Sequence, residues 1–371
     1  MNILVLSWRG LGHPYSGGAE QVTHQHAKAW IRAGHKVTLF TSYFSGAKRN
    51  ETIDGVRIIR RGNQILGVHL AAFFWYLFNK HDKYDLVIDH FHGIPFFTPL
   101  YVRAKKLAVI QETTREVWFL NNFPIPLNWL IGVIGYLTEP WMFLLYKNIC
   151  FMTGSASAKE ALVDFRISGK NITVVHHGVI VVYPSPHPKK EKKFTVVYLG
   201  VLSKDKGIED ALRCFSYLED KGSFNFWVIG RPENKEQEMR VKGIVKELKL
   251  GEKIVFWGFV SQRKKFELLA KAHLLINPSV REGWGLVNIE ANAMGTPVVG
   301  YKVAGVKDSV RDGKTGLLVE HGDFRALAES ALKLVRNKAL YKKLQSNCKD
   351  WASKFDWKES IRKSLKLIES I

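Results

Sequence analysis

Short runs rich in β-branched and other apolar residues alternate with stretches of helical pattern along almost all of this 371-residue chain. Such alternation predicts parallel sheets in an α/β fold. The chain is longer than one ordinary domain, so we expect two. The predicted strands cover residues 3–8, 37–41, 56–59, 86–89, 107–110, 149–152 and 173–175, and then 194–199, 224–229, 254–257, 274–276, 298–301 and 316–319.

One segment interrupts this alternation. Residues 183–193 combine alternating prolines with a run of lysines, a composition typical of a linker. We therefore predict an N-terminal Rossmann-like domain over residues 1–182, a linker over 183–193 and a C-terminal Rossmann-like domain that starts at residue 194. Ligands of such sheets bind at the carboxyl ends of the strands.

Two glutamates in the second half stand in a distinctive setting. Glu282 and Glu290 lie eight positions apart, a Gly-x-Gly turn directly follows the first, and Gly-Thr-Pro and a β-branched run follow the second. If a helix begins near Leu286, its free N–H groups suit a phosphate. Carboxylates that bind hydroxyls beside such a helix end suit a nucleotide-diphosphate sugar. The alternative is a loop acid and a helix acid without a shared ligand.

Other segments fall into an order that strengthens the first interpretation. They are Gly17-Gly18-Ala19-Glu20, the segment 34–38, Gly200-Val201-Leu202 with Lys206-Gly207, and the segment 306–319. With them, nearly the whole chain resembles the retaining family 4 glycosyltransferases of GT-B fold, whose signature is two glutamates separated by seven residues. The resemblance implies two Rossmann-like domains facing a central cleft. It also implies that the C-terminal domain ends at residue 354 and that a helix over 355–371 returns to the first domain.

The resemblance implies metal-independent transfer of a hexose-type sugar from a nucleotide-diphosphate sugar, which is a co-substrate rather than a cofactor. Glu282 would hold sugar hydroxyls, Glu290 the ribose, and Lys206 the diphosphate. The chain lacks an Asp-x-Asp motif, which would have indicated Mg²⁺ or Mn²⁺. The donor-binding residues that it implies are Gly17, Gly18, Lys206, Glu282, Gly283, Trp284, Gly285, Leu286 and Glu290, and we add Arg231 as a candidate cation.

The chain departs from the family's pattern at two places. The family usually has an arginine where this chain has Val201, and Lys204 or Arg231 would have to supply the missing cation. The family also commonly has a histidine after the fifth strand, where this chain has Glu112.

A glutamate can act as a base toward an acceptor hydroxyl, so Glu112 joins Glu282 and Lys206 as a catalytic candidate. His90 and His92, after the preceding strand, are further candidates. The alternative for His90 is a purely structural hydrogen bond at the end of its strand.

The formal charge of +21 is the second strong signal. It can reflect solvated lysines on surface helices, such as 264–265 and 342–343, or a preference for anionic partners. The aromatic residues are not interleaved with the basic runs, so nucleic acid is not favoured. An anionic membrane is the better expectation, since each basic residue near its surface contributes roughly 1 kcal/mol of attraction.

Two apolar stretches, residues 66–78 and 117–138, bear on the same question. The first is too short to cross a membrane, and prolines and asparagines break the second. They are either buried Rossmann helices or a surface that enters the bilayer interface. The aromatic residues expected at such an interface are Trp118, Trp129, Tyr136 and Trp141.

Three widely separated cysteines fit neither a metal site nor a disulfide framework, which indicates a reducing compartment. The N-terminus enters an apolar strand without a signal-peptide pattern. We therefore predict a cytoplasmic protein, peripheral on the inner face of the cell membrane, that acts on a glycan or lipid-linked acceptor. The alternatives are a soluble acceptor, a sugar-nucleotide epimerase of related fold, a catalytically silent binding protein and a nucleic-acid binder.

Overall fold

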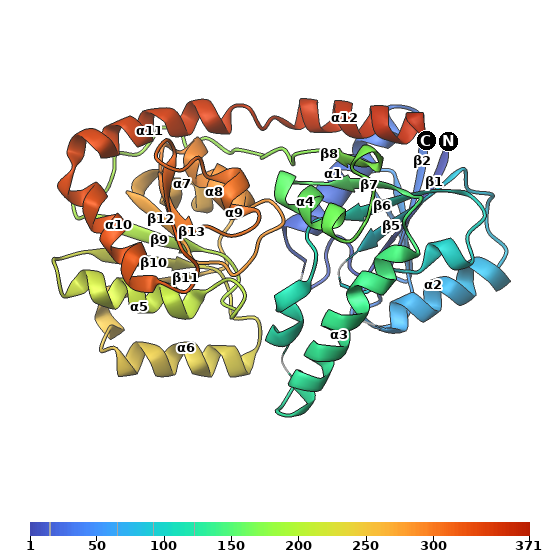
Figure 1. The fold of residues 1–371 in the computed structure, drawn as a ribbon. Coiled ribbons are helices and arrows are strands. Elements are labelled where there is room, and N and C mark those ends of the chain that lie inside the picture. Colours follow the sequence, from blue (N-terminus) through green and yellow to red (C-terminus); the bar gives the residue numbers. More distant parts are fainter. Residues whose placement is uncertain (15, 65, 92, 122) are drawn as a thin grey trace. The chain divides into compact units, whose positions relative to one another are not determined.

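The structure is a computed structural model that describes residues 1–14, 16–64, 66–91, 93–121 and 123–371. Its contacts divide the chain into two compact units (Figure 1). Unit 1 comprises Met1–His177 and Trp357–Ile371, and unit 2 comprises Gly178–Asp356. Each unit holds one sheet with helices packed on both of its faces, which is the predicted α/β architecture.

Unit 1 contains an eight-stranded sheet in the order β3-β4-β2-β1-β5-β6-β7-β8. Its strands are β1 (Asn2–Ser7), β2 (Lys36–Thr41), β3 (Asn50–Ile53), β4 (Val56–Arg60), β5 (Leu86–Phe91), β6 (Lys105–Ile110), β7 (Cys150–Thr153) and β8 (Ile172–Val174). Its helices are α1 (Gly18–Arg32), α2 (Leu66–Phe78), α3 (Leu127–Leu144), α4 (Ala156–Asp164), α12 (Trp357–Ser370) and the short 3₁₀ turns η1 (Thr98–Leu100), η2 (Arg115–Leu120) and η3 (Gly169–Asn171).

All neighbouring strands of this sheet are parallel except β3 and β4, which form an antiparallel hairpin. Its two-residue turn, Asp54-Gly55, has positive φ at both positions (51° and 83°), the geometry that suits the twist of paired strands. The sequence analysis did not predict β3, because its residues are mostly polar and line an edge.

The helices of unit 1 cover the sheet on opposite faces. Ile88 of β5 packs in one cluster with α1 and α12. Val87 packs with α2, and Phe91 packs with Phe143 of α3. Because side chains alternate along a strand, Val87 and Phe91 point to the same face. Helices α2 and α3 therefore cover one face of the sheet, and α1 and α12 cover the other.

The C-terminal helix α12 belongs to unit 1 through specific contacts with α1 (Figure 1). The Ser364 hydroxyl lies 2.9 Å from Nδ1 of His26 and accepts a hydrogen bond from the Trp30 indole. The same hydroxyl donates to the Ile361 carbonyl, so Nδ1–H of His26 is the donor toward it. Trp357 packs edge-on against the His26 ring.

Unit 2 contains a six-stranded, fully parallel sheet in the order β11-β10-β9-β12-β13-β14. Its strands are β9 (Thr195–Leu199), β10 (Asn225–Ile229), β11 (Ile254–Gly258), β12 (Leu274–Asn277), β13 (Val298–Tyr301) and β14 (Gly316–Val319). Its helices are α5 (Ile208–Glu219), α6 (Lys235–Glu247), η4 (Gly251–Lys253), α7 (Gln262–Lys271), α8 (Leu286–Ala293), α9 (Val306–Ser309), α10 (Phe324–Arg336) and α11 (Lys338–Ala352).

The predicted linker, residues 183–193, lies against unit 2. The Lys190 ammonium donates to the Ala272 carbonyl and to the Thr296 hydroxyl, and the Glu191 N–H donates to the Lys271 carbonyl. Unit 2 accordingly begins at Gly178, ahead of the predicted domain start at residue 194.

Candidate functional site

Except for Gly17 and Gly18, which lie in unit 1, the residues predicted for the donor site belong to unit 2. Strand β9 is followed in space by β10 and β11 on one side and by β12, β13 and β14 on the other. The strand order therefore reverses between β9 and β12, and such a switch point is where open α/β sheets bind ligands. Lys206 lies in the loop after β9, and the Gly-x-Gly segment lies in the loop after β12.

Two glycines allow these loops to approach one another closely. Gly207 caps α5 with a φ of 70°, and a Cβ at this position would lie 2.0 Å from the Pro278 carbonyl oxygen. Gly305 caps α9 with a φ of 76°, and its Cβ would lie 2.0 Å from the Glu282 carbonyl oxygen. Any other residue at either glycine would separate the loops, since positive φ and close backbone approach both favour glycine.

Glu282 pairs with Lys206 across these loops. The Lys206 Nζ lies 3.2 Å from Oε2 of Glu282, and the Ser279 hydroxyl donates to Oε1 over 2.8 Å. Lys206 also lies 3.7 Å from Asp205. The structure therefore brings together the carboxylate predicted to bind the sugar and the cation predicted to bind the diphosphate.

Glu290 lies on α8, which begins after Gly285, and its side chain is largely enclosed by protein. Its carboxylate lies 2.5 Å from the Lys265 Nζ of α7, and the two side chains are only 15% and 13% exposed. Burial raises the pKa of the Glu290 carboxyl, and the Lys265 ammonium opposes that rise. The sequence analysis placed Lys265 among solvated surface lysines, and that interpretation is wrong. Its neighbour Lys264 does lie on the outer side, paired with Glu267 at 3.2 Å.

The sequence offered little to separate these two lysines. Lys265 stands one helical turn before the buried Leu269. Its place on the same helix face as Leu269 was the sequence feature that indicated an inward side chain. The contact with Glu290 comes from a helix 25 positions away and has no local signature.

A buried polar network supports the loop that carries Glu282. The Asn277 amide donates to Asn288, and the Asn288 amide donates to the Ser309 hydroxyl. Asn277 also accepts from the Ser279 N–H, which fixes the residue that bonds Glu282. The Trp284 side chain is buried against Phe355. Of the segment Gly283 to Leu286, Trp284 can therefore offer a ligand its main chain but not its indole.

The two candidates for the cation missing at Val201 are both exposed. Val201 itself is exposed, as is Lys204 three positions later. The Arg231 guanidinium stacks over the Phe259 ring, 4.4 Å from its centroid, and the Arg231 carbonyl accepts from the Leu202 N–H. Arg231 thus stands beside the loop after β9, while its charge is held on an exposed ring.

In unit 1, the predicted glycine loop leads directly into α1. Gly17 caps the helix, and its N–H donates to the Glu20 carboxylate over 2.6 Å. Gly18 is the first helical residue. Glu20 is buried and pairs with Arg9 at 3.0 Å. This carboxylate and cation hold the loop in place.

The acceptor-side candidates lie at the carboxyl ends of adjacent strands in unit 1. His90 is buried near the end of β5, and its Nδ1 lies 3.1 Å from the Thr23 hydroxyl, a contact that fits the structural alternative. Glu112 follows β6 and is half-buried. His92 lies outside the described residues.

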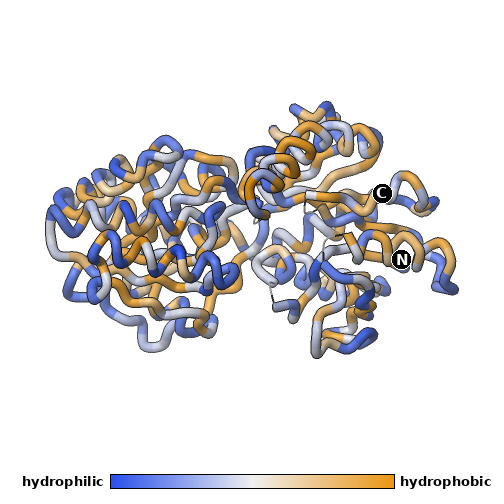
Figure 2. Tube along the Cα trace, turned by 90° about the horizontal axis from the view of Figure 1, so that it is seen from below, coloured by the Kyte–Doolittle hydropathy of each residue, from blue (hydrophilic) through white to orange (hydrophobic). Residues whose placement is uncertain are grey.

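Few apolar side chains of helices α2 and α3 are fully buried, and their hydropathy can be followed along the trace in Figure 2. In α2, only Val68 and Ala72 are buried. In α3, only Gly132, Gly135, Glu139 and Phe143 are buried. Among the described residues, no helix combines the length and apolar character needed to cross a membrane.

We call the exposed apolar residues on and near these two helices the apolar face of unit 1. They are Leu66, Leu70, Phe74, Leu77, Phe78, Leu100, Phe123, Ile125, Leu127, Trp129, Leu130, Ile134, Tyr136, Leu137, Trp141, Leu144 and Leu145.

Trp118 differs from the other aromatic residues expected at an interface. Its indole N–H donates to Glu139 over 3.1 Å, and its ring lies over Gly135. The Glu139 carboxylate also accepts from the N–H groups of Thr114 and Arg115, at 2.6 and 2.7 Å. Trp118 therefore holds α3 to the loop after β6, and the expectation that it faces a membrane is wrong for this residue.

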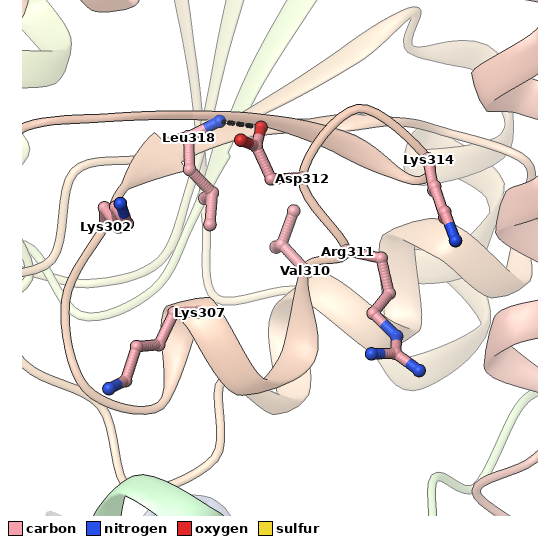
Figure 3. Close-up of a pocket in the computed structure, with 7 residues that line it drawn as sticks. All are labelled: Lys302, Lys307, Val310, Arg311, Asp312, Lys314 and Leu318. Atoms are coloured by element: carbon pink, nitrogen blue, oxygen red, sulfur yellow. Dashed lines mark hydrogen bonds between the residues drawn. The ribbon is translucent and has the colours of Figure 1, made fainter.

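A hollow on unit 2 is lined by several cationic side chains (Figure 3). Its cationic side chains do not converge, since Lys302 and Lys307 point to one side and Arg311 and Lys314 to the other. Asp312 is engaged by the Leu318 N–H at 2.9 Å. The lining residues are Lys302, Lys307, Val310, Arg311, Asp312, Lys314 and Leu318.

Comparison with known families identifies the family to which the chain belongs. Residues 16–182 match the family described as Glycosyltransferase Family 4, and residues 182–351 match the family described as Glycosyl transferases group 1. The two matched segments follow one another along nearly the whole chain. The chain belongs to the family 4 glycosyltransferases, and the predicted family is confirmed.

Among curated relatives, the capsular polysaccharide biosynthesis glycosyltransferase CapM of Staphylococcus aureus is 32% identical over 162 residues, which cover 43% of this chain and 42% of CapM. The chain spans less than half the length of the first curated relatives that it matches: 42%, 41% and 48%.

Solved structures resemble the chain over its whole length. Sucrose-phosphate synthase from Thermosynechococcus elongatus has a TM-score of 0.80 at 20% identity, covering 100% of this chain and 98% of the synthase. HepE of Anabaena, solved in complex with UDP and glucose, has a TM-score of 0.75 at 18% identity and covers 100% of both chains. At these identities the likeness establishes the fold alone, and the predicted GT-B fold is confirmed.

Proposed function

We propose that the protein transfers a hexose-type sugar from a nucleotide-diphosphate sugar to an acceptor hydroxyl, with retention and without a metal ion. The observation that carries this proposal is the pairing of Glu282 with Lys206 and of Glu290 with Lys265 around the start of α8. The family membership supports transfer, and the HepE complex with UDP and glucose supports a nucleotide-sugar donor.

The proposed chemistry needs charge to be stabilised in two places. The bond from the anomeric carbon to the diphosphate breaks, and the electron pair leaves with the diphosphate. Lys206 and the N–H groups at the start of α8 stabilise that charge, while Glu282 orients the sugar through its hydroxyls. The acceptor oxygen forms the new bond on the face that the diphosphate leaves. Its proton passes to the departing phosphate.

We infer that unit 1 binds a lipid-linked or cell-surface glycan acceptor at the inner face of the cell membrane. The apolar face of unit 1 is the main support, since so many large apolar side chains exposed on two helices that cover the same side of the sheet are typical of an interaction surface. Exposed basic residues follow its helices, with Lys80 and Lys83 after α2 and Lys147 after α3. They would meet anionic headgroups. The name of CapM, which refers to capsular polysaccharide, agrees with such an acceptor.

Two measurements test the proposal together. A thermal-shift panel of nucleotide-sugars should reveal a donor, because a ligand that binds only the folded state raises its apparent stability. Incubation of that donor with and without a lipid extract should then give a glycosylated lipid only when lipid is present. An epimerised nucleotide-sugar without transfer would instead establish an epimerase, and transfer to water-soluble glycans alone would establish a soluble acceptor.

A further inference from the structure

We propose that Lys265 is a positioning residue for the donor nucleotide, which holds the Glu290 carboxylate ionised and correctly oriented for the ribose hydroxyls. The inference rests on the proposed function, in which Glu290 is the carboxylate that meets the ribose. It adds a residue from α7, outside the two-glutamate signature, to the machinery of the donor site.

The geometry of the pair is the first support. The Lys265 Nζ reaches the Glu290 carboxylate over 2.5 Å from a neighbouring helix, and both side chains are largely enclosed. Several ion pairs on this unit are far more exposed, such as Lys242 with Glu238 at 72% and 46%. Exposed pairs contribute little, whereas an enclosed carboxylate that loses its partner becomes an uncompensated buried charge.

The electrostatic surroundings of Glu290 make Lys265 the group that opposes the effect of burial on its carboxyl. Helix α8 packs against α7, α9 and α11 and against strands β12 and β13. Among the described residues of these elements, Lys265 is the charged group that acts on the Glu290 carboxyl. Burial raises the pKa of that carboxyl and Lys265 lowers it, so removal of Lys265 leaves burial unopposed.

The protonation state matters because of what a ribose offers. Its two hydroxyls are donors, and an ionised carboxylate accepts at both oxygens, with stronger hydrogen bonds than a neutral acceptor. A protonated carboxyl turns one of its oxygens into a donor and loses part of that capacity. Nucleotide affinity should therefore follow the ionised fraction of Glu290.

The experiment measures the Kd of UDP, ADP and GDP by calorimetry across mildly acidic to mildly alkaline pH. The variants are K265M, K265Q and K265R, and K264M serves as a matched control because Lys264 is the adjacent lysine on the outer side of the same helix. The tightest nucleotide is then compared with its 2′,3′-dideoxy counterpart, which lacks both hydroxyls that Glu290 would bind. Thermal melts establish that each variant is folded.

We expect K265M and K265Q to bind more weakly than wild type, with a Kd that rises as the pH falls through the pKa of Glu290 and levels off at roughly tenfold, the worth of one hydrogen bond to a charged group. Wild type, K265R and K264M should show the same rise only at a lower pH, because a cation at position 265 lowers the pKa of the Glu290 carboxyl. The difference between K265M and wild type should disappear with the dideoxy nucleotide.

Two results would overturn the inference alone. One is a K265M variant that binds the nucleotide as wild type does at every pH, and the other is an equal loss with the dideoxy nucleotide. A wild-type protein that binds none of the three nucleotides would overturn the proposed function as well. Failure of K265M to fold leaves K265Q, which keeps a polar side chain of similar length.

Discussion

At the residue scale, the charged side chains of the proposed donor site are each held in place by a neighbouring side chain of opposite charge. Each of the two glutamates of the family signature stands beside a lysine from another element, Glu282 beside Lys206 and Glu290 beside Lys265. Such pairing fixes rotamers before a ligand arrives, which lowers the entropy lost on binding. The effects of replacing the two glutamates can therefore be compared with each other, and the effect of replacing each lysine can be compared with that of replacing a nearby lysine.

The two glutamates should differ in the kinetic constant that they control. Glu290→Gln should raise the donor Kd roughly tenfold or more, because a hydrogen bond to a charged group is worth about 1.5–3 kcal/mol. Glu282→Gln should instead lower kcat by about 10²–10³, the usual loss for a group that acts in the transition state. Steady-state kinetics with separate donor titrations would measure both, and two unimpaired variants would remove the donor-site assignment.

The two lysines of the loop after β9 offer a second comparison. Lys206 lies beside Glu282, whereas Lys204 is exposed. Lys206→Ala should therefore lower kcat/KM by an amount equivalent to about 2–4 kcal/mol of lost transition-state stabilisation. The loss for Lys204→Ala should be much smaller. If Lys204→Ala were the worse variant, Lys204 would be the cation that compensates for Val201.

At the element scale, helices of unit 1 place their apolar residues in two different environments. Helix α12 buries its apolar residues against α1, where Ser364 joins His26 and Trp30. Helix α3 buries two glycines, Glu139 and Phe143 and leaves its larger residues exposed. The same helical period therefore serves a core contact in one helix and an outward face in the other.

The apolar face of unit 1 should bind anionic vesicles. Trp129 and Trp141 are 63% and 70% exposed on α3, so Trp129→Ser/Trp141→Ser should abolish the part of the binding that survives high salt, because burial of apolar area is not screened. Co-sedimentation at low and high salt measures this binding.

The control variant is Met239→Ser/Phe256→Ser, which removes exposed apolar side chains from unit 2. It should leave binding intact. No sedimentation at any salt would indicate a soluble acceptor.

The contact between α1 and α12 should make unit 1 sensitive to acid. Burial lowers the pKa of His26 from 6.5 to about 4, and its Nε2 has no hydrogen-bond partner among the described residues. Above pH 6.5 the histidine is neutral in both states. As the pH falls from there toward 4, the unfolded chain binds a proton that the folded chain does not, and stability declines by up to roughly 3 kcal/mol.

Chemical denaturation of wild type and His26→Asn over this pH range would test the effect. The variant should lose less stability than wild type between neutral pH and pH 4, because it has no histidine to protonate. Parallel pH profiles for the two proteins would show that His26 does not carry the acid sensitivity.

At the scale of the whole molecule, the proposed reaction is complete without a metal ion, since Lys206 and the start of α8 supply the positive charge. Transfer activity should therefore persist in excess EDTA, measured against an untreated sample at the same ionic strength. Loss of activity with EDTA that Mg²⁺ or Mn²⁺ restores would show that a divalent cation takes part.

Much of the fold could be predicted because strand and helix periods are local properties of the sequence. The predicted strands of both halves are present. Lys206 and Glu282, which the family resemblance singled out separately, form an ion pair in unit 2, and their roles toward a donor stay predictions. The misses were not local. Strand β3 forms by pairing with β4 and not through apolar residues of its own. Lys265 is enclosed because it pairs with Glu290, and Trp118 is turned inward by its hydrogen bond to Glu139.

The division of unit 1 into two chain segments has a consequence for how the protein is made. Residues 1–177 emerge from the ribosome first, yet they lack α12 until all of unit 2 has been synthesised. Until then His26 and Trp30 are exposed, and unit 2, which is continuous, can fold ahead of unit 1. In vivo, the nascent N-terminal half would be the client of chaperones, and a stop codon before Trp357 would damage the half of the protein that was translated first.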